Sequence, residues 1–142
     1  FKVFTGNAKL RFGQFMAATY KAVTPPENFK NMKFKKVTKK AEKAYAMIAI
    51  CMQRDPNESI PLVEETNAVA CAVQNIWLSA HAYGIGMYWS SPGYLYTEVT
   101  NKFLGLEDGQ SCLGVIFMGY HKAPELPARR TSIQDKVEWI RE

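Results

Sequence analysis

Two glycines, a tryptophan and two serines lie close together in the stretch HAYGIGMYWSSPG, residues 81–93. The hydroxyl and backbone N–H groups of such a loop could hold a phosphate or the polar edge of a planar ring, and Trp89 could line that ring. Ser90 and Ser91 could instead cap the next helix, with Trp89 in the core, because serine is common at helix starts. From the loop alone, the capping interpretation is favoured.

The order of elements around these glycines argues against a dinucleotide-binding fingerprint. That fingerprint needs a strand, then the glycines, then a helix whose N-terminus meets the pyrophosphate. Here an apolar helical pattern ends near Tyr83, the glycines follow, and a short strand over residues 85–89 comes next. We therefore expect Gly84 to end the helix, and Trp89 stands where the third glycine would be.

The composition is that of a globular protein with one sizeable core. Of 142 residues, 47 % are hydrophobic and 22 % are charged, which predicts a single domain over residues 1–142. The chain begins at Phe1 in the middle of a strand-like pattern, FKVFT, so we expect the domain to be incomplete at its N-terminus.

The cysteines and the hydropathy pattern bear on the compartment. Cys51, Cys71 and Cys112 stand singly in apolar segments, which favours a reducing, cytoplasmic compartment over a disulfide framework. No apolar run is long enough to span a bilayer, so no membrane partner is expected. No His/Cys spacing indicates a metal site.

A lysine-rich segment carries much of the net charge of +5. Seven lysines fall in KNMKFKKVTKKAEK, residues 30–43. A basic stripe can bind nucleic acid or an anionic cofactor. The favoured interpretation is a solvated helix face, because Phe34, Val37, Ala41 and Ala44 share one side at helical spacing while the lysines occupy the others.

The remaining pattern predicts alternating helices and strands. A helix is expected from Asn7 to about Val23, and unbroken apolar runs predict strands over 45–53 and 112–120, covered on both faces. The longest predicted helix runs from Pro61 to about Tyr83 and is apolar nearly all round. A helix of this kind must be buried on every side, so we expect a second subunit to cover one of its faces.

The order of these elements and several local strings resemble the nitroreductase family of FMN-dependent oxidoreductases. The matching strings are PLVEETNAVACAVQNIWLSAHAYGIGMYW, KFLGLEDGQSCLGVIFMGYHKAP and RRTSIQDKVEW, with FKVFTGNAKLR as a looser match. They correspond to the family's long Ala-rich helix, its Gly-x-Gly turn and Trp-Ser loop, its last strand, and its arginine-bearing C-terminal tail.

The resemblance implies an α+β fold, a three-layer sandwich in which helices flank both faces of a mostly antiparallel sheet. It also implies a homodimer in which the long central helices pack across the two-fold axis. FMN would lie at the dimer interface and carry a hydride from NAD(P)H to a nitro compound, a quinone or a similar small-molecule acceptor. Because the cofactor carries this chemistry, we assign no catalytic side chain.

The resemblance also implies cofactor-binding residues. Trp89, Ser90 and Ser91 match the family's flavin-contacting segment, while Ile85 and Gly86 would offer backbone contacts to the ring. Arg129 and Arg130 match a basic position that reaches the FMN phosphate, which suits the planar fork of arginine. Lys39 or Lys40 could also reach the flavin. The family's N-terminal Arg-Arg-Ser-type segment and Asn-Gln-Pro-Trp-type turn, which hold much of the flavin, have no counterpart here.

Two alternatives remain open at the level of sequence. The same fold could perform another flavin reaction, such as reductive dehalogenation, because acceptor choice depends on the loops above the ring. A non-enzymatic basic module could use the lysine-rich helix to bind nucleic acid. The second alternative is disfavoured because the excess positive charge is confined to residues 30–43, and no nucleic-acid partner is expected.

Overall fold

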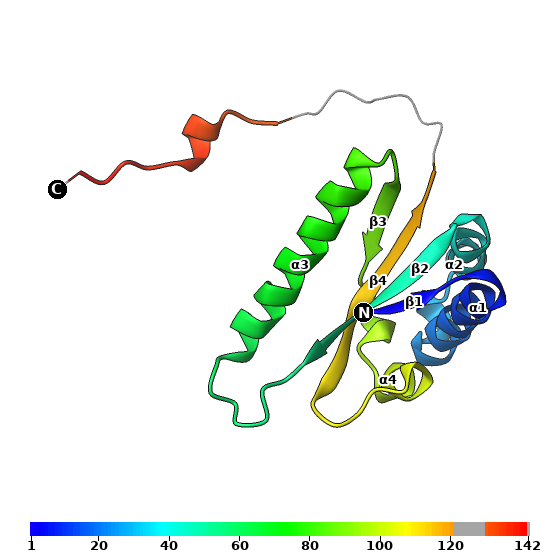
Figure 1. Ribbon diagram of the computed structural model, residues 1–142. Helices are drawn as coiled ribbons and strands as arrows, with labels where there is room; N and C mark the ends of the chain where they lie inside the picture. The colour runs from blue at the N-terminus through cyan, green and yellow to red at the C-terminus, as the bar shows by residue number, and fades with distance from the viewer. Residues whose placement is uncertain (121–129, 142) are drawn as a thin grey trace.

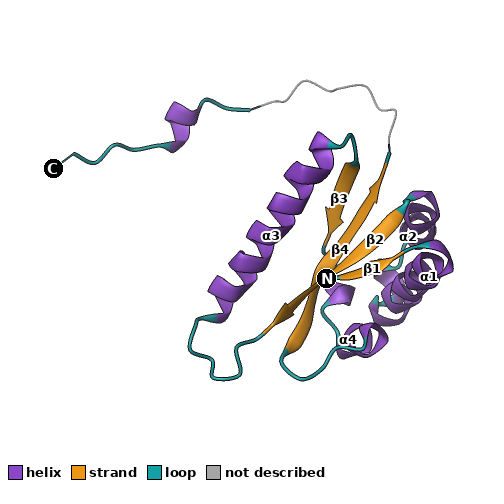
Figure 2. Ribbon diagram, viewed as in Figure 1, coloured by secondary structure: helices purple, strands orange, loops and turns teal. Residues whose placement is uncertain are grey.

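A four-stranded antiparallel sheet forms the centre of the computed structural model, which describes residues 1–120 and 130–141. The strand order is β1-β2-β4-β3, so the last strand in sequence lies inside the sheet (Figure 2). All three neighbouring pairs are antiparallel, as predicted. The strands are β1 (Lys2–Phe4), β2 (Ala46–Gln53), β3 (Gly86–Ser90) and β4 (Gln110–Gly119).

Helices cover both faces of this sheet, which confirms the predicted three-layer arrangement (Figure 1). α1 (Gly6–Val23), α2 (Asn31–Lys43) and α4 (Glu98–Leu104) lie on one face, and α3 (Leu62–Ala82) lies on the other. Three short 3-10 helices complete the described elements: η1 (Pro26–Asn28), η2 (Gly93–Leu95) and η3 (Ile133–Lys136).

The larger core lies between the sheet and the face that carries α1, α2 and α4. Phe12 and Met16 of α1 are buried against Met47 of β2 and Val115 of β4. Aromatic rings extend this core outward, since Phe15 of α1 stacks on Phe103 of α4 with ring centroids 4.0 Å apart. Burial of these apolar side chains fixes the three helices on the sheet.

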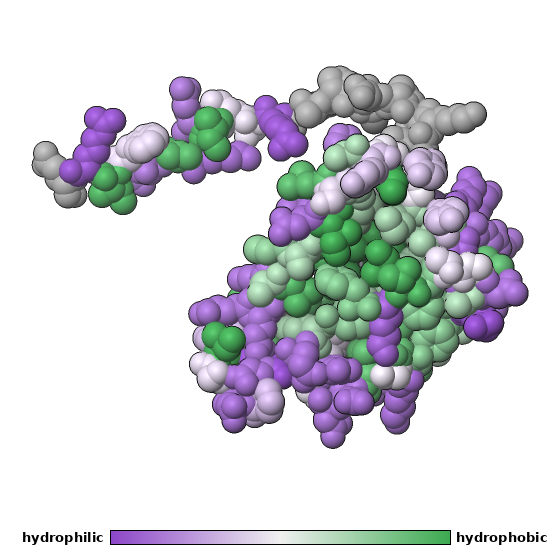
Figure 3. Space-filling model, viewed as in Figure 1, coloured by the Kyte–Doolittle hydropathy of each residue, from purple (hydrophilic) through white to green (hydrophobic). Residues whose placement is uncertain are grey.

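The smaller core lies under α3 and leaves most of that helix uncovered. Ile48, Ile50 and Ile116 of the sheet pack against Val73 of α3. Val73 and Ala80 are the buried residues of α3, while Leu78 is 60 % exposed. Within this chain, therefore, the helix is not enclosed on every side, and apolar side chains gather over α3 and the neighbouring sheet face (Figure 3).

Glycine permits the close contact between α1 and α2. A Cβ on Gly13 would overlap the Cβ of Ala41 on α2, so the absence of a side chain at Gly13 allows the helices to approach. This contact explains a glycine inside a helix, where it costs about 1 kcal/mol relative to alanine. The start of α1 differs from the prediction, since Thr5 rather than Asn7 is the N-cap.

Gly84 ends α3 as predicted. Its φ of +69° is in the left-handed region, where glycine meets no Cβ penalty. The backbone N–H of Gly84 donates to the carbonyl of His81, and that of Ile85 donates to the carbonyl of Ala80, each at 2.9 Å. This paired arrangement is the Schellman motif, and it reverses the chain into β3.

The C-terminal segment, residues 130–141, projects from the body of the molecule (Figure 1). Its apolar side chains are exposed, including Trp139 at 79 % and Ile140 at 83 %. Of the two arginines assigned to the FMN phosphate, Arg130 is exposed in this segment and Arg129 falls outside the described residues. None of the helices in the described parts of the chain is both long and apolar enough to cross a bilayer.

Candidate functional site

A groove of about 550 Å³ adjoins the loop that follows β3, and we call it the Pro92 groove. Pro92, Gly93 and Tyr94 form one side of it, immediately after Ser91. The other side comes from the end of α1, the connection to α2, and the first turn of α2. Its remaining lining residues are Tyr20, Val23, Thr24, Asn28, Lys30 and Lys33.

Two lysines give the Pro92 groove a positive charge. Lys33 Nζ lies 4.8 Å from the centre of the Tyr20 ring, within the range of a cation–π interaction. The phenol oxygen of Tyr20 accepts a hydrogen bond of 3.0 Å from the backbone N–H of Lys30. Tyr20 thus holds the connection between α1 and α2, and a cation lies beside an aromatic face.

The loop also presents backbone donors. η2 begins after Pro92 without a side-chain cap, so neither Ser90 nor Ser91 caps the next element as the alternative interpretation supposed. Among the described residues, no group accepts a hydrogen bond from the backbone N–H of Ser91 or Gly93. Both residues are exposed, and Gly93 lines the groove, where its N–H can meet an acceptor atom.

Burial raises the pKa of the Tyr94 phenol. Removal from water, with smaller contributions from the nearby phenols of Tyr20 and Tyr88, raises the pKa of Tyr94 to about 12. The side chain is 7 % exposed and belongs to the larger core. The loop is therefore anchored by an aromatic residue that carries no charge at neutral pH.

Trp89 and Ser90 lie on opposite faces of the sheet, because side chains alternate along a strand. Trp89 packs against the core under α3, whereas Ser90 pairs with Val115 of the larger core. Ser90 and Ser91 precede the residues that line the Pro92 groove but do not line it themselves, and the Trp89 indole faces α3.

Gly114 of β4 allows the indole of Trp89 to approach the backbone of β4 closely. A Cβ at this position would be 2.5 Å from Trp89 Nε1 and 2.9 Å from the carbonyl oxygen of Ser90. The φ of Gly114 is +141°, a conformation that side-chain-bearing residues rarely adopt. Trp89 Nε1 is buried and has no hydrogen-bond partner in the described structure. The contact between Trp89 and Gly114 therefore fixes the position at which the loop leaves the sheet.

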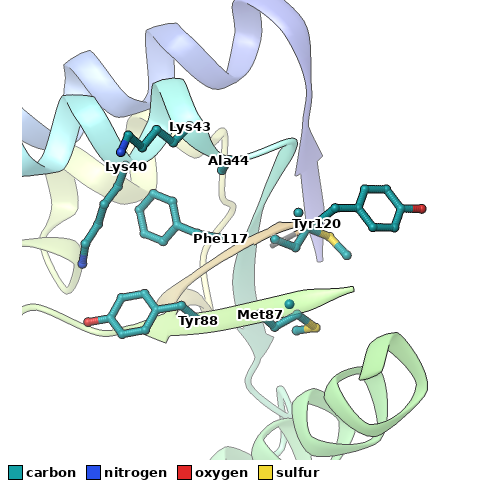
Figure 4. A pocket seen from close by; sticks show the side chains of 10 residues that line it. Lys40, Lys43, Ala44, Met87, Tyr88, Phe117 and Tyr120 are labelled. Carbon is teal, nitrogen blue, oxygen red and sulfur yellow. The ribbon is translucent and has the colours of Figure 1, made fainter. Parts of the chain in front are cut away.

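A second groove, of about 420 Å³, lies at the opposite end of β3, and we call it the Tyr88 groove (Figure 4). Gly86 belongs to it, while Ile85 lies at the start of the strand, so the structure separates these two predicted contacts from Ser90 and Ser91. The groove is lined by Lys40, Lys43, Ala44, Gly86, Met87, Tyr88, Phe117, Met118, Gly119 and Tyr120.

The lysines of the Pro92 groove were missed at the level of sequence. Lys39 and Lys40 were the predicted candidates, but Lys30 and Lys33 line the groove beside Gly93, and Lys40 lies 4.2 Å from the centre of the Tyr88 ring. No sequence signal distinguishes them from the other lysines, because only the antiparallel course of α2 and β3 brings the start of α2 to the end of β3.

Comparison with known proteins gives a consistent result. The model of the nitroreductase family matches residues 1–120. YfhC of Bacillus subtilis, whose name assigns it to the NAD(P)H nitroreductases, is 33 % identical over 90 residues. That match covers 63 % of this chain and 45 % of YfhC, so it spans less than half of the relative's length.

Solved structures share the fold. A nitroreductase-like family protein from Bacillus cereus is 28 % identical with a TM-score of 0.68, and the match covers 98 % of this chain and 71 % of that one. CinD from Lactococcus lactis, in complex with nicotinic acid, has 16 % identity and a TM-score of 0.77, and the match covers 99 % of this chain and 75 % of CinD. A Desulfovibrio desulfuricans protein in complex with FMN has 19 % identity and a TM-score of 0.62, with coverage of 96 % of this chain and 69 % of that protein. The last two likenesses concern the fold alone.

Proposed function

The chain belongs to the nitroreductase family, and on this premise we propose that it is an FMN-dependent oxidoreductase. It passes a hydride from NAD(P)H to a nitro compound, a quinone or a similar acceptor. The names of its relatives support this reaction, since YfhC is named as an NAD(P)H nitroreductase and the Desulfovibrio desulfuricans neighbour was crystallised with FMN.

The observation that carries the proposal is the composition of the Pro92 groove. FMN combines a planar ring with an anionic phosphate, and the groove combines aromatic side chains, two lysines and the backbone N–H of Gly93, which has no acceptor in the part of the chain that the structure describes. Its volume of about 550 Å³ falls within the range of roughly 300–1,000 Å³ that small-molecule sites occupy. The residues present therefore fit this cofactor.

The residues of the groove have distinct tasks in this proposal. A bound FMN would supply the hydride-transfer chemistry. Lys30 and Lys33 would hold its anionic or polar groups through their positive charge, and the backbone N–H of Gly93 would donate to one of its acceptor atoms. Tyr94 anchors the loop in the core, so these donors are held in place before the ligand arrives.

We further propose a homodimer in which a second copy covers the face that carries α3. This apolar face includes Val3 of β1 and Leu62, Val63 and Leu78 of α3, with exposed fractions between 54 % and 66 %. Val3 points to this side because its neighbour Phe4 packs in the opposite core. Contiguous apolar surface of this kind is typical of a protein interface, and the exposed side chains of Trp139 and Ile140 supply further apolar area.

Flavin titration tests the proposed function. Added FMN is expected to bind at micromolar concentrations, with quenching of its fluorescence, and NADH or NADPH should then bleach the flavin absorption. Replacement of Lys33 by glutamine is expected to weaken FMN binding about two- to fivefold, the usual range for one exposed ion pair.

Lys39→Gln is the matched control, because Lys39 lies on the same helix and lines neither groove. It removes the same charge and should leave FMN affinity unchanged. A protein that takes up no FMN, or equal weakening by both substitutions, would contradict the proposal.

A further inference from the structure

The Tyr88 groove combines an aromatic wall with two cations. Tyr88 of β3 and Phe117 of β4 are register partners, with ring centroids 6.3 Å apart. Lys40 reaches from α2 toward both rings, with its Nζ 4.2 Å from the centre of Tyr88 and 5.8 Å from that of Phe117 (Figure 4). Lys43 lies one turn further along α2 at the rim of the same groove.

This surface is open to a ligand. β3 is an edge strand of the sheet, and the side chain of Tyr88 on this strand is 50 % exposed. In the described parts of the chain, neither Lys40 nor Lys43 forms an ion pair with a carboxylate. An aromatic face beside uncompensated positive charge is suited to a flat ring that carries phosphate.

One side of α2 connects this groove to the Pro92 groove. Lys33, Lys36, Lys40 and Lys43 follow spacings of three and four residues, so they lie along one side of the helix. The step from Lys33 to Lys40 is seven residues, or about 10 Å at the helical rise.

We propose that the Tyr88 groove binds the adenosine half of NAD(P)H, while the nicotinamide half extends to the Pro92 groove. This inference rests on the proposed function, and it assigns the reductant a second point of attachment on the protein. The base packs on the half-exposed ring of Tyr88, behind which Phe117 is buried, and the phosphates lie along the lysines of α2. Lys33 lines one groove and Lys40 the other, so the row Lys33, Lys36 and Lys40 offers positive charge to the pyrophosphate that joins the two halves.

The test compares the whole reductant with its nicotinamide half. Using the FMN-loaded protein, steady-state kinetics are measured with NADPH, with NADH and with reduced nicotinamide mononucleotide, which lacks the adenosine. Lys40→Gln is expected to raise the KM for NADPH and NADH about two- to fivefold. It should leave kcat, and the KM for the mononucleotide, unchanged.

Calorimetric titration with ADP-ribose provides a second measurement that needs no turnover. The unaltered protein is expected to bind ADP-ribose, and Tyr88→Leu should weaken this binding about two- to tenfold through loss of the aromatic contact. Lys40→Arg should restore the affinity lost in Lys40→Gln, and Lys39→Gln should resemble the unaltered protein. Circular dichroism checks that each variant is folded.

The outcomes separate the two proposals. If Lys40→Gln raises the KM for the mononucleotide as much as that for NADPH, or if ADP-ribose does not bind, the adenosine site is wrong while flavin reduction still supports the enzyme. If none of the reductants bleaches the flavin, the proposed function fails. The ADP-ribose titration then decides by itself whether the Tyr88 groove binds an adenosine nucleotide.

Discussion

At the scale of single residues, the loop of the Pro92 groove depends on the indole of Trp89 behind it. A Cβ added at Gly114 would lie 2.5 Å from Trp89 Nε1 and 2.9 Å from the carbonyl oxygen of Ser90, so both groups approach this glycine closely. Three residues after Ser90, Gly93 lines the groove. A small residue on β4 thereby influences where the loop after β3 begins.

Gly114→Ala is expected to destabilise the protein and displace this loop. The added methyl group would collide with Trp89 Nε1, and a φ of +141° is unfavourable for alanine. Overpacking of this kind costs about 1–3 kcal/mol, which urea unfolding would measure, and FMN affinity should fall as the donors move. Gly93→Ala is the stability control, because its Cβ would meet nothing within 4 Å. Equal stability of the two variants would show that the Trp89 contact is unimportant.

The sequence allowed part of this site to be predicted. The loop after residues 85–89 was identified from its residue types, but the predicted strand stopped at Trp89 and so did not include Ser90. The structure extends β3 to Ser90, and the alternation of side chains then puts the two residues on opposite faces. Lys30 and Lys33 could not be distinguished from five other lysines, because only the packing of α2 on the sheet selects them.

At the scale of elements, the closeness of α1 and α2 shapes one wall of the Pro92 groove. Gly13 and Ala41 are the contact point, and the connection between the helices supplies Thr24, Asn28 and Lys30. A change in the distance between the helices would therefore change the groove as well as the core.

Gly13→Ala tests this coupling. Its methyl group would overlap Ala41, so we expect a loss of about 1–3 kcal/mol in the free energy of unfolding, with weaker FMN binding. The double variant Gly13→Ala, Ala41→Gly restores the space and should recover much of both quantities. If the single variant is as stable as the unaltered protein, the two helices can separate at little cost.

The start of α3 is held by an acidic side chain that makes stability depend on pH. Glu65 accepts a hydrogen bond from Arg54 Nη1 at 2.7 Å and another from the backbone N–H of Asp55 at 2.7 Å. These two hydrogen bonds lower the pKa of Glu65, and the bond from Arg54 has the largest effect. Hydrogen bonds from Ser59 and from the backbone of Asn57 likewise lower the pKa of Asp55.

A lowered pKa means that the folded state favours the ionised carboxylate. The stabilisation is therefore complete above the ordinary value of about 4.3 for a glutamate, and it is lost as the pH falls through the lower folded value. Glu65→Gln should remove part of this dependence in unfolding measurements between pH 6 and pH 3. Glu64→Gln, at an exposed position in the first turn of the same helix, should leave this pH dependence unchanged. An unchanged acid profile in Glu65→Gln would mean that the contact with Arg54 contributes nothing to stability.

The elements themselves were largely predictable. The unbroken apolar runs at 45–53 and 112–120 became β2 and β4, displaced by one or two residues at their ends, because strands covered on both faces have that pattern. The helix at 61–83 was also found, since its length and cap signals are strong. Its exposure was not predictable, because the apolar character of a helix does not say whether its own chain or another covers it.

At the scale of the whole molecule, the uncovered face of α3 predicts self-association. Leu78→Lys places a charge on this face and should convert the proposed dimer to a monomer in sedimentation experiments. Met32→Lys is the matched control, because Met32 is 81 % exposed on α2, away from that face. A dimer that survives Leu78→Lys, or that is lost in Met32→Lys, would place the interface elsewhere.

The order of the strands has a consequence for biosynthesis. β4 leaves the ribosome after β1, β2 and β3, yet it lies between β2 and β3 and contributes to both cores. Until β4 emerges, β2 has one open edge and two apolar faces, and the whole of α3 has been made before its sheet is complete. Exposed strands and helices of this kind aggregate readily during synthesis. The nascent chain is therefore expected to need a chaperone, and a stop codon placed before Gln110 should yield insoluble protein.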